Sequence, residues 1–312
     1  MSLPTVDPRD EASGVAADQP ARLTIFAIPK PFRGPIATIQ RNALASWTRL
    51  GPNVQILLFG QEEGVAAAAA EFGVEHWPEI ARNEHGTPLV SDAFAQAECR
   101  SRAPYLAYCN ADLILLQDFL LTIERLTSAQ PKAFLAIGRR INLEVTRPID
   151  FTSNSELQQL LESAARGERE SLMCKDYFIF PRGQFGSLPD FAVGRGNWDS
   201  WLVQSAKVRA IPVVDLSRCL RVIHQNHDHA HVPGGRAASY WHGPEARQNQ
   251  LAAGGKFWIR GATADWELTP YALRRKPWSR LQLPFWFDLP QALRLAWRLA
   301  RPSDPHRSQK PA

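Results

Sequence analysis

The chain has 312 residues, of which 45% are hydrophobic and 21% charged, so its composition is that of a globular protein with one large domain or two small ones. Its net charge of +5 is modest, and no Lys/Arg stripe of the kind used to bind a duplex is present, so we expect no nucleic-acid partner. The four cysteines have no CxxC spacing, which argues against a zinc ribbon.

The N-terminal segment, residues 1–21, is polar and without periodicity, and we expect it to be disordered. It has no apolar core of a signal peptide, and no stretch of the sequence is long and apolar enough to span a bilayer. These features predict a cytoplasmic protein, with membrane association limited to surface contact.

From residue 22 onward, buried strands alternate with amphipathic helices. The predicted elements are a strand at 23–28, a helix at 36–50, a strand at 53–60, a helix at 62–73, a strand at 74–80, a helix at 91–102 capped by Ser91 or Asp92, and a strand at 105–116. Further on, the pattern predicts strands at 133–145, 176–183 and 211–216, and helices at 154–168 and 197–210. This alternation predicts an α/β/α sandwich with a mixed, mostly parallel central sheet.

Asn110, Ala111 and Asp112 interrupt the apolar run at 105–116. Burying an unpaired carboxylate is costly, and ligands of such sheets bind beyond the carboxyl ends of the strands. We therefore expect Asp112 to face a ligand crevice and to hold Mn²⁺ or Mg²⁺, with Asn110 as a weaker oxygen donor. An aspartate that only caps a turn is the alternative.

The segments "TIFAIPKPF", "VQILLFG", "GTPLVSDAF" and "DLILLQDF", in this order, resemble the GT-A class of nucleotide-sugar glycosyltransferases, and within it a little-characterised group from bacteria and plants. The resemblance covers about residues 22–260 and implies a GT-A-like, Rossmann-like catalytic domain at 22–265. Asn110 stands where the class's D-x-D motif has its first aspartate. The implied activity is metal-assisted, inverting transfer of a sugar from a nucleotide-diphosphate donor to a hydroxyl of a glycan or lipid-linked acceptor, in glycan or cell-surface polysaccharide synthesis.

The resemblance also implies contacts with the donor at Ile28, Pro29, Lys30, Gln61, Glu62, Asn110 and Ala111, although the class often has an aspartate where this chain has Gln61 and Glu62. From the residues themselves we add Gly86, Thr87 and Asp92, and also Arg195, which stands between Gly194 and Gly196 in what reads as a tight loop. The segment from Gly86 to Asp92 leads into a helix, whose N-terminal N–H groups suit a phosphate or a ribose. An ordinary loop and helix cap would have the same sequence.

Asp199 lies at the start of the helix predicted at 197–210, which Asn197 would cap. The resemblance implies that Asp199 is the general base, which must come within hydrogen-bond distance of the acceptor hydroxyl. Trp198 and Trp201 beside it suggest a wall on which a sugar stacks. The alternative is a carboxylate that only stabilises the helix dipole, and the sequence leaves inversion or retention open.

Four histidines, His224, His227, His229 and His231, fall within eight residues. Dense histidine tracts suggest metal binding. The resemblance implies that His224 completes the donor metal site, with His227 as the second choice, so the expected ligands are Asp112, His224 and His227. The alternatives are surface histidines or a metal hydrolase built on the cluster.

Residues 266–312 form a basic, Trp- and Arg-rich tail with an amphipathic helix expected at 290–301. Such a helix suits contact with an anionic membrane surface, or it packs on the domain. Because Asn110 departs from the motif, a catalytically weak nucleotide-sugar or glycan-binding protein of the same fold is an alternative to the enzyme.

Overall fold

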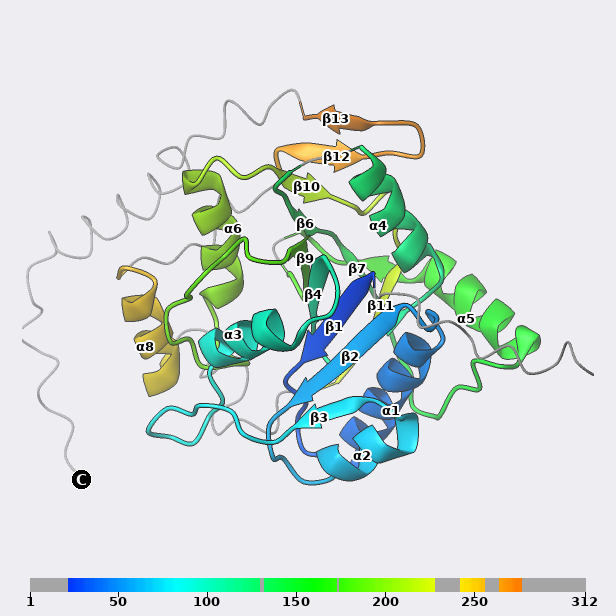
Figure 1. Ribbon diagram of the computed structural model, residues 1–312. Coiled ribbons are helices and arrows are strands. Elements are labelled where there is room, and N and C mark those ends of the chain that lie inside the picture. The colour runs from blue at the N-terminus through cyan, green and yellow to red at the C-terminus, as the bar shows by residue number, and fades with distance from the viewer. Residues whose placement is uncertain (1–21, 130–131, 173, 228–241, 256–263, 277–312) are drawn as a thin grey trace, which may run out of the picture.

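The computed structural model describes residues 22–129, 132–172, 174–227, 242–255 and 264–276 (Figure 1). The segment 1–21, most of the tail with the helix expected at 290–301, and His229 and His231 lie outside these residues. Among the helices described, none is both long and apolar enough to cross a membrane.

A nine-stranded sheet forms the centre of the described fold, in the order β13-β12-β10-β6-β9-β4-β1-β2-β3. Its strands are β1 (Leu23–Ala27), β2 (Val54–Phe59), β3 (Glu75–Trp77), β4 (Tyr105–Cys109), β6 (Leu135–Ile137), β9 (Tyr177–Pro181), β10 (Val213–Asp215), β12 (Trp266–Leu268) and β13 (Leu273–Arg275). Of these, only β9 and β13 pair antiparallel to their neighbours. The prediction of a mixed, mostly parallel sheet is confirmed.

Helices cover both faces of this sheet (Figure 1). On one face lie α1 (Gly34–Thr48), α2 (Val65–Phe72) and α4 (Asp118–Ser128), which share a core with Leu23 and Ile25 of β1. On the other lie α3 (Val90–Arg100) and α6 (Trp198–Val208), which pack on Phe26. Successive residues of a strand point to opposite faces, so the continuous apolar runs of the sequence supply both cores of the sandwich.

A smaller four-stranded sheet lies beside the first, in the order β5-β11-β7-β8. Its strands are β5 (Leu113–Leu115), β11 (Val222–Gln225), β7 (Arg140–Leu143) and β8 (Glu168–Arg169). Helix α5 (Asn154–Arg166) packs on it and closes a third apolar core.

Two predicted strands are each divided between the two sheets, which corrects the sequence analysis. The run at 105–116 is β4 followed by β5, and the turn between them is Asn110–Asp112, closed by a hydrogen bond from the Leu113 N–H to the Asn110 carbonyl. The run at 133–145 is β6 followed by β7, with Gly138 in between. Local apolar pattern cannot show such a change of sheet, because both halves are buried strands.

Two further expectations are wrong. Helix α3 begins after Leu89 without a side-chain cap: Ser91 donates a hydrogen bond to Asp190, and the carboxylate of Asp92 accepts one from the backbone of Ala81. Residues 266–275, which the sequence analysis placed in the tail, form β12 and β13 at the edge of the central sheet. The folded part therefore extends beyond residue 265.

Gly138 lies between β6 and β7, where the chain passes from the central sheet to the smaller one, and it packs against the side chain of Tyr177. A substitution at Gly138 therefore tests the packing at this crossing. A Cβ at position 138 would lie 2.0 Å from the hydroxyl oxygen of Tyr177, which is buried and finds no hydrogen-bond partner in the part of the chain that the structure describes. We expect Gly138→Ala to lower the free energy of unfolding by about 1–3 kcal/mol through overpacking. In a Tyr177→Phe background the penalty should shrink, as measured by urea denaturation; an equal penalty in both backgrounds would contradict this packing.

Candidate functional site

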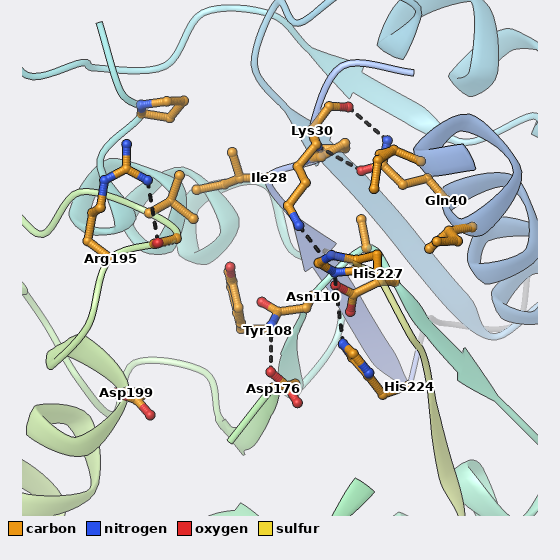
Figure 2. Close-up of a pocket in the computed structure, with 18 of the residues that line it drawn as sticks. Ile28, Lys30, Gln40, Tyr108, Asn110, Asp176, Arg195, Asp199, His224 and His227 are labelled. Carbon is orange, nitrogen blue, oxygen red and sulfur yellow. Dashed lines mark hydrogen bonds and ion pairs between the residues drawn. The ribbon is translucent and has the colours of Figure 1, made fainter. Parts of the chain in front are cut away.

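A cavity of about 650 Å³ opens beyond the ends of β1 and β4, and residues of β7 and β11 in the smaller sheet also line it. Figure 2 shows part of its lining. Of the fifteen residues that the sequence analysis selected, thirteen line it. They are Ile28, Pro29, Lys30, Glu62, Gly86, Thr87, Asn110, Ala111, Asp112, Arg195, Asp199, His224 and His227. The topology thus brings together residues that are up to 199 positions apart in the sequence, from Ile28 to His227.

Gln61 and Asp92 do not line this cavity. The carboxylate of Asp92 instead accepts hydrogen bonds from the backbone of Ala81 and the side chain of Gln96, which hold the loop before α3. Glu62, the residue after Gln61, does line the cavity, and its carboxylate forms an ion pair with Arg82 at 2.9 Å. Gln61 and Asp92 are therefore not expected to contact a donor bound in this cavity.

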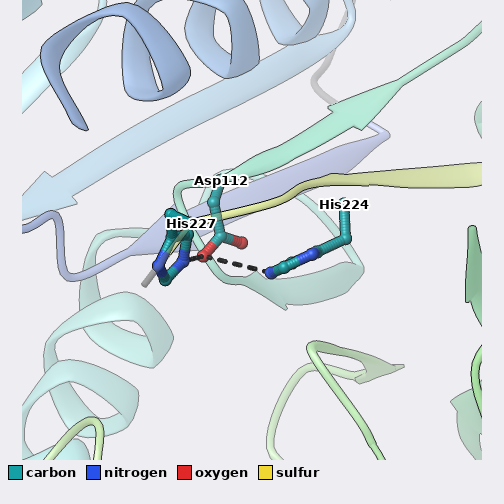
Figure 3. A group of neighbouring side chains, drawn as sticks. All are labelled: Asp112, His224 and His227. Atoms are coloured by element: carbon teal, nitrogen blue, oxygen red, sulfur yellow. Dashed lines mark hydrogen bonds and ion pairs between the residues drawn. The ribbon is translucent and has the colours of Figure 1, made fainter. Parts of the chain in front are cut away.

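Asp112, His224 and His227 converge at one point of the cavity wall (Figure 3). Their ligand atoms all lie within 4.8 Å of one another. His227 Nε2 is 3.0 Å from Asp112 Oδ2, and His224 Nε2 is 3.9 Å from the same oxygen. The convergence has a topological cause: β11 pairs antiparallel with β5, so the chain that carries the histidines returns alongside the turn that carries Asp112.

The chemistry of this set fits a divalent cation. Asp112 Oδ1 and His224 Nδ1 are buried and have no hydrogen-bond partner among the described residues. Burial would raise the pKa of Asp112, but His224, the hydrogen bond with His227 and Lys30 hold this pKa well below its usual range. Burial lowers the pKa of His224 and so favours the neutral imidazole that binds metals. An ionised carboxylate and two imidazoles suit a first-row divalent ion such as Mn²⁺ better than Mg²⁺, which prefers oxygen ligands.

Lys30 brings a positive charge close to this group (Figure 2). Its backbone N–H and carbonyl are both bonded to the side chain of Gln40, at 2.7 and 2.8 Å. Its ammonium lies 3.3 Å from His227 Nε2. The loop after β1 is thereby held in place, and the end of the Lys30 side chain reaches the same cluster.

Asn110 is not part of the group formed by Asp112, His224 and His227, which we call the cation cluster. Its amide group donates a 2.8 Å hydrogen bond to Asp176, and Asp176 also forms an ion pair with Arg140 at 2.5 Å. An aspartate at position 110 would set two carboxylates against each other, whereas the amide supplies the donor that Asp176 requires. Arg140 was missed in the sequence because the run at 133–145 read as one strand, which concealed that β7 faces the cavity.

Asp199 lies in the first turn of α6 and lines the cavity, as expected (Figure 2). Its carboxylate is 3.7 Å from the ammonium of Lys175, whose side chain is fully buried. Asn197 takes the N-cap position, but its side chain makes no capping hydrogen bond.

Trp198 and Trp201 do not form a sugar-stacking wall. The ring of Trp198 packs against Tyr108 and Phe178, with ring centroids 5.1 and 5.3 Å apart, and the ring of Trp201 packs against Phe191 at 5.4 Å. Both tryptophans belong to the core under α6, because the helix needs large apolar side chains to fill its contact with the sheet.

Glu245, on α8 (Pro244–Ala252), supports the opposite side of the cavity. Its carboxylate accepts hydrogen bonds from Arg195, at 2.8 and 2.5 Å, and from Asn83 at 2.8 Å, and it is also bonded to the side chain of Thr87. One carboxylate therefore connects three segments and fixes the guanidinium of Arg195 beside the cavity. The sequence around Glu245 gives no sign of this role, since its partners lie up to 162 residues away.

No protein-family model matches the chain, and a search of curated proteins gives no match either. Its structure is similar to that of glucosyl-3-phosphoglycerate synthase from M. tuberculosis in complex with phosphoglyceric acid, with 17% identity and a TM-score of 0.45 over 83% of this chain and 87% of that chain. It is also similar to a complex of the same synthase with Mn²⁺, uridine diphosphate and glucosyl-3-phosphoglycerate, with 15% identity and a TM-score of 0.42 over 67% and 73% of the two chains.

A third similarity is to residues 1–349 of S. aureus TarS, with 5% identity and a TM-score of 0.31. It covers 41% of this chain and 38% of that one. The TM-score is below 0.5 in all three comparisons. Similarity at this level gives no information about the substrate or the catalytic activity of this chain. Both have to be argued from the residues that line the cavity.

Glu245 provides a test of how the cavity wall is held. We expect Glu245→Gln to lower the free energy of unfolding by roughly 1.5–3 kcal/mol, because it removes charge-assisted hydrogen bonds. Hydrogen exchange of the backbone amides in residues 82–88 and 191–196 should become faster.

The matched control for this prediction is Glu267→Gln. The side chain of Glu267 is 14% exposed against 11% for Glu245, but its arginine partners are more than half exposed, so this change should cost under about 1 kcal/mol. Equal costs for the two variants, with exchange unchanged in both loops, would show that Glu245 does not hold the wall.

Proposed function

We propose that this protein is a glycosyltransferase that moves a sugar from a nucleotide-diphosphate donor to a hydroxyl acceptor, with inversion and with the help of a divalent cation. The observation that carries the proposal is the convergence of Asp112, His224 and His227 at the end of β4, in the wall of a cavity of about 650 Å³. A nucleotide-sugar is a ligand of suitable size for such a cavity, and its diphosphate suits a site with a bound cation.

The cation would be held by Asp112, His224 and His227. Bound there, Mn²⁺ or Mg²⁺ supplies Lewis-acid stabilisation of the charge that develops on the departing diphosphate, worth several kcal/mol. The low pKa of the Asp112 carboxyl keeps it ionised for this task at neutral pH. We favour Mn²⁺ because two of the three ligands are imidazoles.

The donor would lie across the ends of β1 and β4. Lys30 stands on the cation side of the cavity and Arg195 on the other (Figure 2). Gly86 and Thr87, in the loop before α3, also line the cavity. Their backbone N–H groups donate to Asn83 and their carbonyls accept from Arg82 and Asn83, so these two residues shape the wall rather than present free N–H groups to a phosphate. Arg195, fixed by Glu245, would donate hydrogen bonds to donor oxygen atoms from a pre-set position.

Asp199 would act as the general base. Its side chain is 24% exposed and lines the cavity, so an acceptor hydroxyl can reach it. The buried ammonium of Lys175, 3.7 Å away, orients the carboxylate without a short hydrogen bond. The carboxylate would accept the hydroxyl proton while the acceptor oxygen attacks the anomeric carbon and the donor diphosphate departs from the opposite side. A glycan or lipid-linked acceptor is what the sequence resemblance implies, and the helix expected at 290–301, which would contact a membrane, lies outside the described residues.

One observation also favours a second function. Two histidines and one aspartate are a ligand set that metal hydrolases use with a water in the open position. A hydrolase would bind the metal tightly without any nucleotide and would release the sugar to water. The transferase reading requires a donor-dependent product that carries the acceptor.

Metal binding gives the most direct test of the proposed site. We expect the full chain to bind Mn²⁺ more tightly than Mg²⁺ in isothermal titration, in the presence of a uridine or guanosine diphosphate. Asp112→Asn should weaken Mn²⁺ binding by at least tenfold, about 1.4 kcal/mol, because it removes the charged ligand. Asp92→Asn, outside the cavity, is the matched control and should bind Mn²⁺ as the wild type does. Equal Mn²⁺ affinity in the wild type and both variants would contradict a metal site at Asp112.

Asp199 gives a separate test of the chemistry. Asp199→Asn keeps the shape of the side chain but cannot accept the proton, so we expect kcat to fall by on the order of 10²–10⁴-fold. Donor affinity should stay within about twofold, since Asp199 acts on the acceptor. Product analysis of a nucleotide-sugar donor library with the wild type identifies the reaction. A variant that retained full turnover would exclude Asp199 as the base.

A further inference from the structure

Two imidazole nitrogens face one carboxylate oxygen of Asp112, and the ammonium of Lys30 lies beside one of them. His227 Nε2 lies 3.0 Å and His224 Nε2 3.9 Å from Asp112 Oδ2, and the ammonium of Lys30 lies 3.3 Å from His227 Nε2. The exposed fractions of the Asp112 and His227 side chains are only 13% and 9%. The carboxylate of Asp112 is therefore largely shielded from water and has the imidazoles of His224 and His227 beside it, with the Lys30 ammonium next to His227.

The contact of Lys30 with His227 is not a simple hydrogen bond that stabilises both partners. A ring nitrogen carries either a hydrogen or a lone pair. If His227 Nε2 donates to Asp112, it cannot also accept from Lys30, and if it accepts from Lys30, it turns a lone pair toward the Asp112 oxygen. The Lys30 ammonium therefore stands 3.3 Å from a ring nitrogen that is itself 3.0 Å from the Asp112 carboxylate, close to where a cation held by Asp112 and His227 would lie.

A divalent ion bound by Asp112 and His227 would repel this ammonium at close range. The backbone of Lys30 is held by Gln40 through two hydrogen bonds, so the flexible four-carbon side chain is the part that can move. When the ammonium moves away from His227 and Asp112, a second anion in the cavity would attract it. The diphosphate of the proposed donor provides one.

We propose that Lys30 competes with the divalent cation for Asp112 and turns to the donor diphosphate when the cation binds, so that cation and nucleotide diphosphate bind cooperatively. This inference rests on the proposed function for the identity of the anion. The competition itself concerns only the cation and residues of this chain. Because binding effects are reciprocal, the cation also frees Lys30 for the diphosphate, and the diphosphate, by holding Lys30, favours the cation.

The test is isothermal titration of the full chain with Mn²⁺ alone, with uridine diphosphate alone, and with each in the presence of the other. In the wild type, we expect each ligand to raise the affinity for the other by at least tenfold. Lys30→Met removes the competitor, so Mn²⁺ alone should bind at least fivefold more tightly than to the wild type. Affinity for uridine diphosphate alone should fall, and the cooperativity should decrease by the same factor by which Mn²⁺ binding has tightened.

Two variants serve as controls. Lys30→Arg retains a positive charge and should bind Mn²⁺ alone as the wild type does. Arg33→Met removes one positive charge from an exposed ion pair with Glu63, so it reports the effect of net charge alone and should leave Mn²⁺ affinity unchanged within about twofold.

The outcomes separate this inference from the proposed function. Equal or weaker Mn²⁺ binding by Lys30→Met, with nucleotide binding intact in the wild type, overturns the role of Lys30 and leaves the transferase proposal standing. Tighter Mn²⁺ binding by Lys30→Met, with no nucleotide binding by the wild type, supports the competition and contradicts the transferase. Tighter binding by Arg33→Met to the same degree would reduce the effect to net charge and also overturn the inference.

Discussion

The structure of the site depends on the burial of one carboxylate. Asp112 is carried by a turn between two apolar strands, and a buried carboxylate must be compensated by cations or hydrogen-bond donors. Here the compensation comes from distant parts of the chain: Lys30 follows β1, and His224 and His227 come with β11. The fold brings these groups to the end of β4, and the same groups then form a ligand set for a divalent cation.

Two features of the fold make this convergence possible. The chain leaves the central sheet at Asn110–Asp112 and again at Gly138, so the smaller sheet stands against the carboxyl ends of β1 and β4. On the other side of the cavity, Glu245 joins Arg195 and the loop of Asn83. The cavity is thus bounded on one side by strands of a sheet and on the other by segments joined through Glu245. Charged groups held in this way can stabilise a developing charge without first having to reorient.

The sequence predicted the sandwich and most of the cavity because these depend on local patterns: apolar runs that end in polar residues, and a carboxylate between two buried strands. It could not predict the division of 105–116 and 133–145 between two sheets, since strand pairing is decided by tertiary contacts. For the same reason it missed Arg140 and Glu245, and it assigned Trp198 and Trp201 to a surface that they do not form. Asp92 was selected for its place near a helix start, and only the fold shows that it holds the loop of Ala81.

The central claim is that Asp112, His224 and His227 hold a divalent cation next to a nucleotide diphosphate. A crystal structure of the full chain grown with Mn²⁺ and uridine diphosphate, with anomalous scattering recorded at the manganese edge, tests it most directly. The account predicts one strong anomalous peak in contact with Asp112, His224 and His227, and with diphosphate oxygen atoms. A diphosphate in the cavity without a peak at these three residues, or a peak at another place, would contradict it.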